Sequence, residues 1–379
     1  MADVTVSYNI QADDEVITEQ TSLSFNDSGF YRDMSDQRAL LYAVTLTRNI
    51  FVPTNVLVGL MGNFLALAVF TASHQRHLSS SGYLAALACA DNLFLVSLFV
   101  TWLDGIRPIL MSDGSCRVII FITYISSFLS VWYVVCFTSE RYIAICHSLR
   151  APMILGKLSE KVVVIVLVIL ACLLYNFALW TTSVAQYRGR PICISDDTYF
   201  ELMNIVTWID TAITMIIPFL LILFMNLRIV WCVFMYQNKR RSILQTHTTA
   251  VKNTSQMRIT RTLLLVSTTF LVLNLPSHVI RLEQLIISHR GPVPLYKMLI
   301  QELTQLIYYS TFSVNFFLYA IYGKHFKRSL KIMLNNLCRR KQPRGSEWSR
   351  SDYNRTSLTS MHMIQRNTNG SMSKNYNDL

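Results

Sequence analysis

Seven long apolar segments run through the chain, and each is long enough to cross a lipid bilayer as a helix. A membrane-spanning helix needs about 20 mostly apolar residues, and the clearest segment holds the uncharged run VVVIVLVILACLL at 162–174. The segments cover residues 49–73, 80–104, 114–146, 160–184, 203–236, 256–284 and 297–321. This pattern predicts an all-α membrane protein with a bundle of seven transmembrane helices. An odd number of spans places the two termini on opposite sides of the membrane.

The composition favours a membrane protein over a nucleic-acid-binding protein or an enzyme. Of the 379 residues, 52% are hydrophobic and only 15% are charged, whereas a soluble domain has about a quarter charged residues. The net charge of +12 comes from basic residues between and after the apolar segments, and no nucleic-acid-binding motif accompanies them. No GxSxG, HExxH or nucleotide-binding loop is present. The unequal segments also do not divide into the paired halves of a transporter.

The basic residues between the segments predict the orientation of the chain. If the N-terminus is extracellular, 22 of the 34 Lys and Arg residues lie on the inner side, as the positive-inside rule requires. We therefore expect a multi-pass protein of the plasma membrane. Its parts are an extracellular tail at 1–47, a seven-helix domain with a membrane-surface helix at 48–335, and a disordered cytoplasmic tail at 336–379.

Both tails carry candidate modification sites. Asn26 begins an Asn-Asp-Ser sequon on the predicted outer side, where it is either glycosylated or bare. The string KHFKRSLKIMLNNLCRR after Gly323 predicts an amphipathic helix that lies on the inner lipid surface. Cys338 at its end is either palmitoylated or an exposed thiol. The polar, Ser- and Thr-rich tail that follows is typical of a kinase substrate.

Four polar motifs interrupt the apolar segments, and their order resembles a known family. The first segment contains Gly62-Asn63, the second LACAD with Asp91, the third ends in ERY at 140–142, and the seventh contains NFFLY with Asn315. Ionisable residues inside a membrane helix are costly and functional by default. Together these motifs resemble the rhodopsin-like, or class A, G-protein-coupled receptors. The strings LNLPSHVIR and NFFLYAIYGKHFK also look like invertebrate neuropeptide receptors, including the FMRFamide-type group.

The resemblance implies that the ERY motif controls coupling to a heterotrimeric G protein. Glu140 would neutralise Arg141, and separating them would free Arg141 for the partner; the alternative is a static surface ion pair. The family pattern is altered at two switch positions, because Asn274 replaces a common tryptophan and Phe316 a common proline. Arrestin and receptor kinases are further implied partners of the tail. The residues that the resemblance assigns to coupling and switching are Glu140, Arg141, Tyr142, Val131, Pro218, Phe270, Asn274, Pro276 and Tyr319.

The resemblance also implies a cation site and a disulfide. Asp91, Asn63, Ser130 and Asn315 would form a buried polar cluster, which either holds Na⁺ or is hydrogen-bonded without an ion. Cys116 and Cys193 match the family's disulfide, which would pin the second outer loop over the ligand entrance. The other cysteines are interpreted mainly as small apolar residues inside helices.

The expected ligand is a short peptide. By the resemblance, Thr123 stands where amine receptors carry an Asp, and Tyr309 stands where opsins carry the retinal lysine. Acids together with Arg281 suit a peptide; the alternative ligand is a lipid or another non-amine small molecule anchored by Arg281. The charges could also simply pair between helices. The candidate wall residues are Asp104, Thr123, Tyr124, Ser127, Trp208, Asp210, Thr211, His278, Arg281, Gln301, Glu302, Gln305 and Tyr309.

Overall fold

A computed structural model describes residues 28–72, 80–155, 159–187, 189–242, 247–287 and 294–340. The Asn26 sequon and the tail beyond 340 lie outside these ranges, and so do the surroundings of the Cys338 side chain. The chain divides into a unit ending at Leu330 and a second unit beginning at Lys331. The candidate functional site lies in the first unit, whereas Cys338 and the tail belong to the second.

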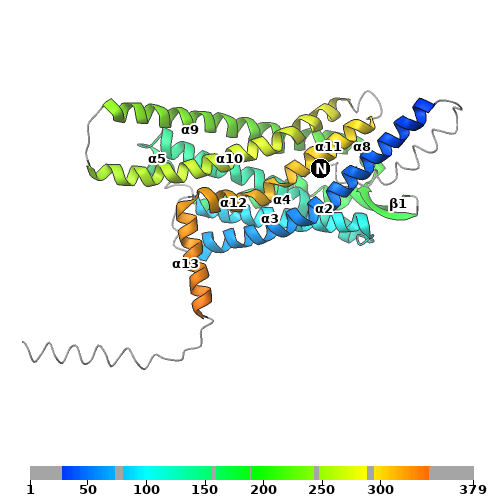
Figure 1. Cartoon of the computed structure of the whole chain (residues 1–379), viewed down its shortest axis with the longest axis horizontal. Coiled ribbons are helices and arrows are strands. Elements are labelled where there is room, and N and C mark those ends of the chain that lie inside the picture. The colour runs from blue at the N-terminus through cyan, green and yellow to red at the C-terminus, as the bar shows by residue number, and fades with distance from the viewer. Residues whose placement is uncertain are drawn as a thin grey trace, which may run out of the picture. The chain divides into compact units, whose positions relative to one another are not determined.

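Long helices make up most of the described chain and run side by side in Figure 1. The first four spans are formed by α2 (Ser28–Ala72), α3 (Ser81–Ile106), α4 (Asp113–Cys146) and α6 (Glu160–Tyr175) with α7 (Ala178–Thr181). The fifth comprises α8 (Phe200–Thr211), the π-helix η4 (Ala212–Ile216) and α9 (Ile217–Ser242), and the sixth is α10 (His247–Ile287). The seventh comprises α11 (Leu295–Tyr309) and α12 (Thr311–Tyr322).

The remaining elements are short or follow the bundle. A single helical turn, α5 (Ala151–Leu155), follows α4, and η3 (Asp197–Tyr199) precedes α8. The strands β1 (Thr182–Tyr187) and β2 (Arg190–Ser195) form an antiparallel hairpin. The helix α13 (Lys324–Arg340) follows the seventh span.

The seven-helix prediction is confirmed, with a break in the last helix. In the described chain, 6 helical stretches are long and apolar enough to cross a membrane. The seventh expected span is divided at Ser310 between α11 and α12, so neither half reaches that length alone. Ser310 keeps helical dihedral angles of φ −61° and ψ −24°. The two halves therefore follow one another with only a local interruption.

Burial separates the central helix of the bundle from a peripheral one. In α4, 67% of the most apolar window is buried within the protein, whereas the figure for the fourth span is 28%. Val162, Ile165 and Leu173 on the fourth span are exposed. Such apolar side chains suit contact with lipid, because the bilayer core is as apolar as they are. Helix α4 therefore lies at the centre of the bundle and can carry residues that face several neighbours.

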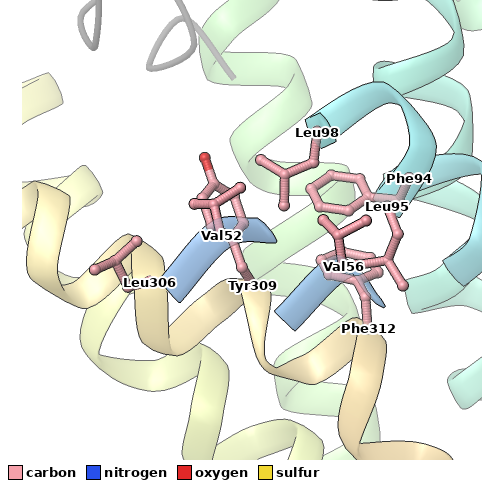
Figure 2. Close-up of a cluster of buried hydrophobic side chains, with 8 residues drawn as sticks. All are labelled: Val52, Val56, Phe94, Leu95, Leu98, Leu306, Tyr309 and Phe312. Atoms are coloured by element: carbon pink, nitrogen blue, oxygen red, sulfur yellow. The ribbon is translucent and has the colours of Figure 1, made fainter. Parts of the chain in front are cut away.

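A cluster of buried side chains fastens the first, second and seventh spans together, as Figure 2 shows. The rings of Phe94 on α3 and Phe312 on α12 stack with centroids 3.7 Å apart. Gly59 on α2 allows this close approach, because a Cβ atom there would lie 2.6 Å from Leu95 and 2.8 Å from Ser313. Small residues at such contacts allow helix backbones to pack closely.

Several predicted boundaries were wrong because hydropathy detects only the part of a helix that lies in lipid. The first helix begins at Ser28, inside the segment expected as a tail at 1–47. The fourth helix ends at Thr181, because the chain from Thr182 pairs with the second strand. The last helix was predicted correctly, because α13 spans the whole string KHFKRSLKIMLNNLCRR from Lys324 to Arg340.

Candidate functional site

The centre of the bundle contains a polar cluster around Asp91, which is fully buried. The hydroxyl of Ser130 donates a hydrogen bond of 2.6 Å to one carboxylate oxygen of Asp91, and the amide of Asn315 donates one of 2.8 Å to the other. Asn63 instead donates to the backbone carbonyl of Phe312 at 2.8 Å. Three of the four expected residues are therefore joined directly, and the fourth ties α2 to the seventh span beside them.

The chemistry of this cluster fits a small hard cation. Carboxylate and hydroxyl oxygens are the donors that such ions take. Within the part of the chain that the structure describes, no cationic side chain forms an ion pair with Asp91. A buried carboxylate is costly unless a counter-charge accompanies it. Asp91 and Ser130 would supply the oxygen ligands, and the bound ion would supply the missing positive charge.

At one end of the bundle, the ERY motif forms a closed network. The guanidinium of Arg141 lies 2.7 Å from the carboxylate of Glu140, and both side chains are almost fully buried. The hydroxyl of Ser80 donates to Glu140 at 2.6 Å and accepts from Arg141 at 2.8 Å. We call Ser80, Glu140 and Arg141 the latch. Because Ser80 precedes α3, the latch connects α4 to the beginning of α3.

The fourth span holds Ser80 in the position that the latch requires. Ser80 has a left-handed backbone with φ 77°, a conformation that residues other than glycine seldom adopt. The carboxylate of Glu160 accepts hydrogen bonds from the backbone N–H groups of Ser80 at 3.0 Å and Gly82 at 2.8 Å. A carboxylate at a helix N-terminus satisfies orphan donors and complements the helix dipole. Sequence reasoning missed both Ser80 and Glu160, because their contacts join segments about 80 positions apart.

The other residues that the resemblance assigned to switching lie on α4, α9, α10 and α12. Val131 on α4, Phe270 on α10 and Tyr319 on α12 are buried. Tyr142 shares a contact of 3.3 Å with the His147 ring. Pro276 lies inside α10. The π-helix at 212–216 precedes Pro218, which is consistent with the backbone irregularity that an interior proline imposes.

Asn274 joins the sixth span to the seventh. Its side-chain amide donates to the carbonyl of Phe270 at 2.6 Å and to the hydroxyl of Thr311 at 3.2 Å. Asn274 is fully buried. A polar link therefore occupies the position where the family pattern has a large ring, next to the break at Ser310 in the seventh helix.

The opposite end of the bundle carries the β-hairpin, which is fastened to the start of α4. A disulfide joins Cys116 to Cys193, the expected pair, with their Cα atoms 5.6 Å apart. Asp113 accepts from the backbone N–H of Val184 at 2.8 Å, and Arg117 donates to the carbonyl of Thr182 at 2.9 Å. The hairpin is thus held at several points over this end of the bundle.

A small cavity of about 50 Å³ lies among the helices below the hairpin end. Asp210 on α8 pairs with Arg281 on α10 at 3.0 Å, and the hydroxyl of Tyr175 on α6 donates to Asp210 at 2.8 Å. Ser127 and Tyr308 share a hydrogen bond of 3.0 Å across the cavity. The expected wall residues that line this cavity are Thr123, Tyr124, Ser127, Asp210, His278, Arg281, Gln305 and Tyr309.

Five expected wall residues do not line this cavity. Asp104 accepts hydrogen bonds from the backbone N–H groups of Ile109 and Leu110 at 2.7 Å each, so it shapes the turn after α3. Trp208 lies on the exposed side of α8, two positions from Asp210. Because two positions rotate a helix by about 200°, both cannot face the cavity. The others are Thr211, Gln301 and Glu302, which are buried on α8 and α11.

The most consequential residues that sequence reasoning missed here are Tyr175 and Tyr308. Tyr175 ends the apolar run of α6, so the sequence suggests only another residue in contact with lipid. In the structure its ring stacks on that of Tyr124 with centroids 5.2 Å apart, and its hydroxyl donates a hydrogen bond to Asp210. Tyr308 precedes the residue that the family pattern selected. A buried tyrosine hydroxyl needs a polar partner, which is the signal that could have pointed to both.

The comparisons with known proteins agree with this geometry. The family described as 7 transmembrane receptor (rhodopsin family) matches residues 62–319, which is more than half of the chain. The chain belongs to this family. The receptor is 27% identical over 360 residues to the neuromedin U receptor homolog nmur-2 of Caenorhabditis elegans, covering 86% of this chain and 85% of the relative. It is 25% identical over 317 residues to the rat somatostatin receptor type 4, covering 80% and 77%.

Family membership settles the broad class of the protein. It is a multi-pass membrane protein of a receptor family, and this family is not a family of enzymes. The FMRFamide-type resemblance stays a prediction, because the two relatives above are named for other ligands.

Proposed function

We propose that the receptor binds a short neuropeptide at the hairpin end and transmits the signal to a heterotrimeric G protein at the latch end. The hairpin end and the N-terminus then face the outside of the plasma membrane. Family membership supports G-protein coupling, and the two relatives are named as receptors for somatostatin and for neuromedin U, both peptides.

The ion pair between Asp210 and Arg281 carries the proposal for a peptide. It places one acid and one base from different helices beside the cavity, and Arg281 keeps 19% of its side-chain surface exposed. A peptide offers the matching groups: carboxylates or carbonyls for Arg281, and an amine or guanidinium for Asp210. Exchanging the internal pair for peptide contacts would loosen the link between α8 and α10.

The latch provides the second state that such a signal needs. A ligand changes the balance between two conformations only by its differential affinity for them. Peptide binding that favours separation of α8 and α10 would favour a state in which Arg141 leaves Glu140 and Ser80. Freed Arg141 would then contact the G protein, as the family resemblance implies.

The test is a screen of short neuropeptides, including amidated ones, on cells that express the receptor, with calcium and cyclic AMP as readouts. We expect a peptide active at nanomolar concentration. Arg281→Gln should weaken its potency, whereas Arg38→Gln, which removes an exposed arginine in the N-terminal part of α2, should not. Arg141→Ala should abolish signalling and leave peptide binding intact.

A second candidate ligand is a lipid or another non-amine small molecule. The rings of Phe94, Tyr124 and Tyr308 line a cavity of only about 50 Å³, which is small for a peptide side chain without further opening. Silence across the peptide library at confirmed surface expression, followed by a response to an anionic small molecule that is lost in Arg281→Gln, would replace the peptide proposal.

We also propose that the Asp91 cluster binds Na⁺, because Asp91 has no cationic side chain as a partner in the described chain. Purified receptor should unfold at a higher temperature in sodium chloride than in N-methyl-glucamine chloride at equal ionic strength. Asp91→Asn should remove the difference. Equal unfolding temperatures in both salts for the unsubstituted receptor would leave a hydrogen-bonded cluster without an ion.

The proposal also includes covalent modifications and partner proteins of the two tails. Arrestin and receptor kinases are expected to act on the Ser- and Thr-rich tail, glycosylation is expected at Asn26 and palmitoylation at Cys338. Glycosidase treatment of the surface protein and metabolic labelling with a palmitate analogue test the two modifications. Asn26→Gln and Cys338→Ser are the matched controls.

A further inference from the structure

A second pair of cysteines lies at the latch end of the bundle. Cys146 is the last residue of α4, and Cys232 lies on α9. Their sulfur atoms are within bonding distance, and their Cα atoms are 5.7 Å apart, which is within the separation of protein disulfides. Both side chains are half-buried. Sequence reasoning assigned these cysteines no more than a packing role.

The two thiols meet because they end a continuous seam between α4 and α9. Ile222, Met225 and Ile229 are buried at helical spacing on α9, and Cys232 continues that row by one more turn. The hydroxyl of Ser139 on α4 donates to the sulfur of Met225 at 3.2 Å. A bond between Cys146 and Cys232 would therefore close the last turn of a contact that already exists, with little change in the backbone.

The compartment makes this pair different from the pair at the hairpin end. If the latch end is cytosolic, as the proposed function requires, Cys146 and Cys232 face a reducing environment, whereas Cys116 and Cys193 face an oxidising one. Cytosolic disulfides are usually transient and redox-sensing rather than structural. The reduced form is also accommodated, because the carbonyl oxygen of Arg228 lies 3.5 Å from the Cys146 sulfur and would accept a hydrogen bond from the S–H group of the reduced thiol.

We propose that Cys146 and Cys232 form a reversible redox site, whose oxidation by peroxide fastens α4 to α9 and reduces G-protein coupling. The chemistry balances with hydrogen peroxide as the oxidant. One thiolate attacks the peroxide, the O–O bond breaks, and a sulfenic acid and water form. The second thiol attacks that sulfur, the S–S bond forms, the S–O bond breaks, and a second water leaves. Glutathione thiols reverse the step by thiol–disulfide exchange.

The position of the bond explains its effect on coupling, and this step rests on the proposed function. Cys146 lies five positions beyond Arg141 on the same helix, and the structure with the sulfurs together is also the structure with the latch closed. A covalent link would prevent α9 from moving away from α4 at the end where the G protein is expected. It would thereby favour the closed state over any open one.

The first experiment tests the pairing and needs no ligand or G protein. Full-length receptor in lipid nanodiscs is treated with hydrogen peroxide or with reduced glutathione, free thiols are blocked with N-ethylmaleimide, and the digest is mapped by mass spectrometry. We expect a peptide linked through Cys146 and Cys232 after peroxide and two blocked thiols after glutathione. Two blocked thiols under both conditions would overturn the proposal, and so would a bond that survives glutathione.

The second experiment tests the lock. The Glu140→Ala receptor is used because it is expected to stimulate nucleotide exchange on a G protein without a ligand. This ligand-independent rate is the basal exchange. It is oxidised or reduced, freed of reagent, and only then mixed with a panel of purified G proteins. Oxidation should lower basal exchange roughly tenfold in this background and in its Cys172→Ser version, which removes an exposed thiol on α6.

The double variant Cys146→Ser/Cys232→Ser should lose this response to peroxide. It retains Cys116 and Cys193, so a peroxide or glutathione effect that persists in it would come from elsewhere and would overturn the lock. If a mapped bond leaves exchange unchanged, the lock is also wrong. If no variant stimulates any G protein, the proposed function fails and the lock fails with it, while the peptide map still decides whether the two thiols are a redox site.

Discussion

Each end of the bundle contains a disulfide and a buried ion pair, but the two ion pairs are built differently. At the hairpin end, Asp210 and Arg281 are 71 positions apart and connect two helices directly. At the latch end, Glu140 and Arg141 are neighbours on one helix, and among the residues that the structure describes only Ser80 forms a hydrogen bond to them from another segment. Opening the first pair therefore changes helix packing, whereas opening the second mainly releases a charged side chain. This difference suits an end that receives a ligand and an end that presents Arg141 to a partner.

The largest effect is expected when the disulfide at the hairpin end is removed. Replacing Cys116 and Cys193 by Ser should greatly reduce surface expression and ligand affinity, since losing a native disulfide typically costs about 2–5 kcal/mol. Cell-surface labelling and peptide binding measure the effect. The matched control is Cys172→Ser, which removes a thiol without a disulfide and should leave both unchanged. Normal binding after loss of the bridge would mean that Asp113 and Arg117 hold the hairpin by themselves.

The next largest effect is expected at the Asp210–Arg281 pair. Asp210→Asn removes the ion pair with Arg281 and weakens the bond from Tyr175, so thermal stability should fall by about 2 kcal/mol. The double variant Asp210→Asn/Arg281→Gln should recover part of this loss, because both partners of the ion pair are then replaced by neutral side chains. Thermal unfolding of the purified proteins gives the coupling energy. Strictly additive effects would show that the pair does not join α8 to α10 energetically.

The latch should respond through signalling more than through stability. Glu140→Ala should raise basal activity at equal surface expression. Ser80→Ala removes the hydroxyl shared by both charged groups and should raise basal activity less, by roughly fivefold for a hydrogen-bond loss of about 1 kcal/mol. Basal G-protein activation in cells measures both variants. Basal activity that is unchanged in Glu140→Ala would identify a static ion pair in place of a latch.

The smallest effect is expected from Glu160, and it tests whether the fourth span supports the latch. Glu160→Gln keeps one acceptor oxygen, so the backbone N–H of either Ser80 or Gly82 loses its acceptor. It also removes the charge at the start of α3, which is worth about 0.3–1 kcal/mol. We expect a slight fall in unfolding temperature and a small rise in basal activity. Lys161→Gln, a neighbouring charge change, serves as the control. A larger effect from the control would show that Glu160 does not support the latch.

Sequence patterns predicted the bundle well because lipid imposes a simple rule on each span. An apolar segment of sufficient length must form a helix in the membrane, so the segments around Asp91, Ser130 and Asn315 could be found one by one. The ERY motif and the Cys116–Cys193 pair followed from resemblance. The helix ends were less predictable, since Thr182 leaves the helix only because β2 is available to pair with it. Which of the expected wall residues line the cavity also depended on helix rotation, as Trp208 and Asp210 illustrate.

The sequence by itself determined the class of protein, the number of spans, and the residues too polar to lie in lipid without a partner. Only the tertiary structure decided which residues contact them. Tyr175 reaches Asp210, Ser80 completes the latch, and Cys146 meets Cys232, each across a gap of at least 35 positions. Hydropathy is a property of each segment, so it can be read along the chain. A hydrogen bond or a disulfide depends on how helices rotate and pack against one another, and that is set by the whole bundle.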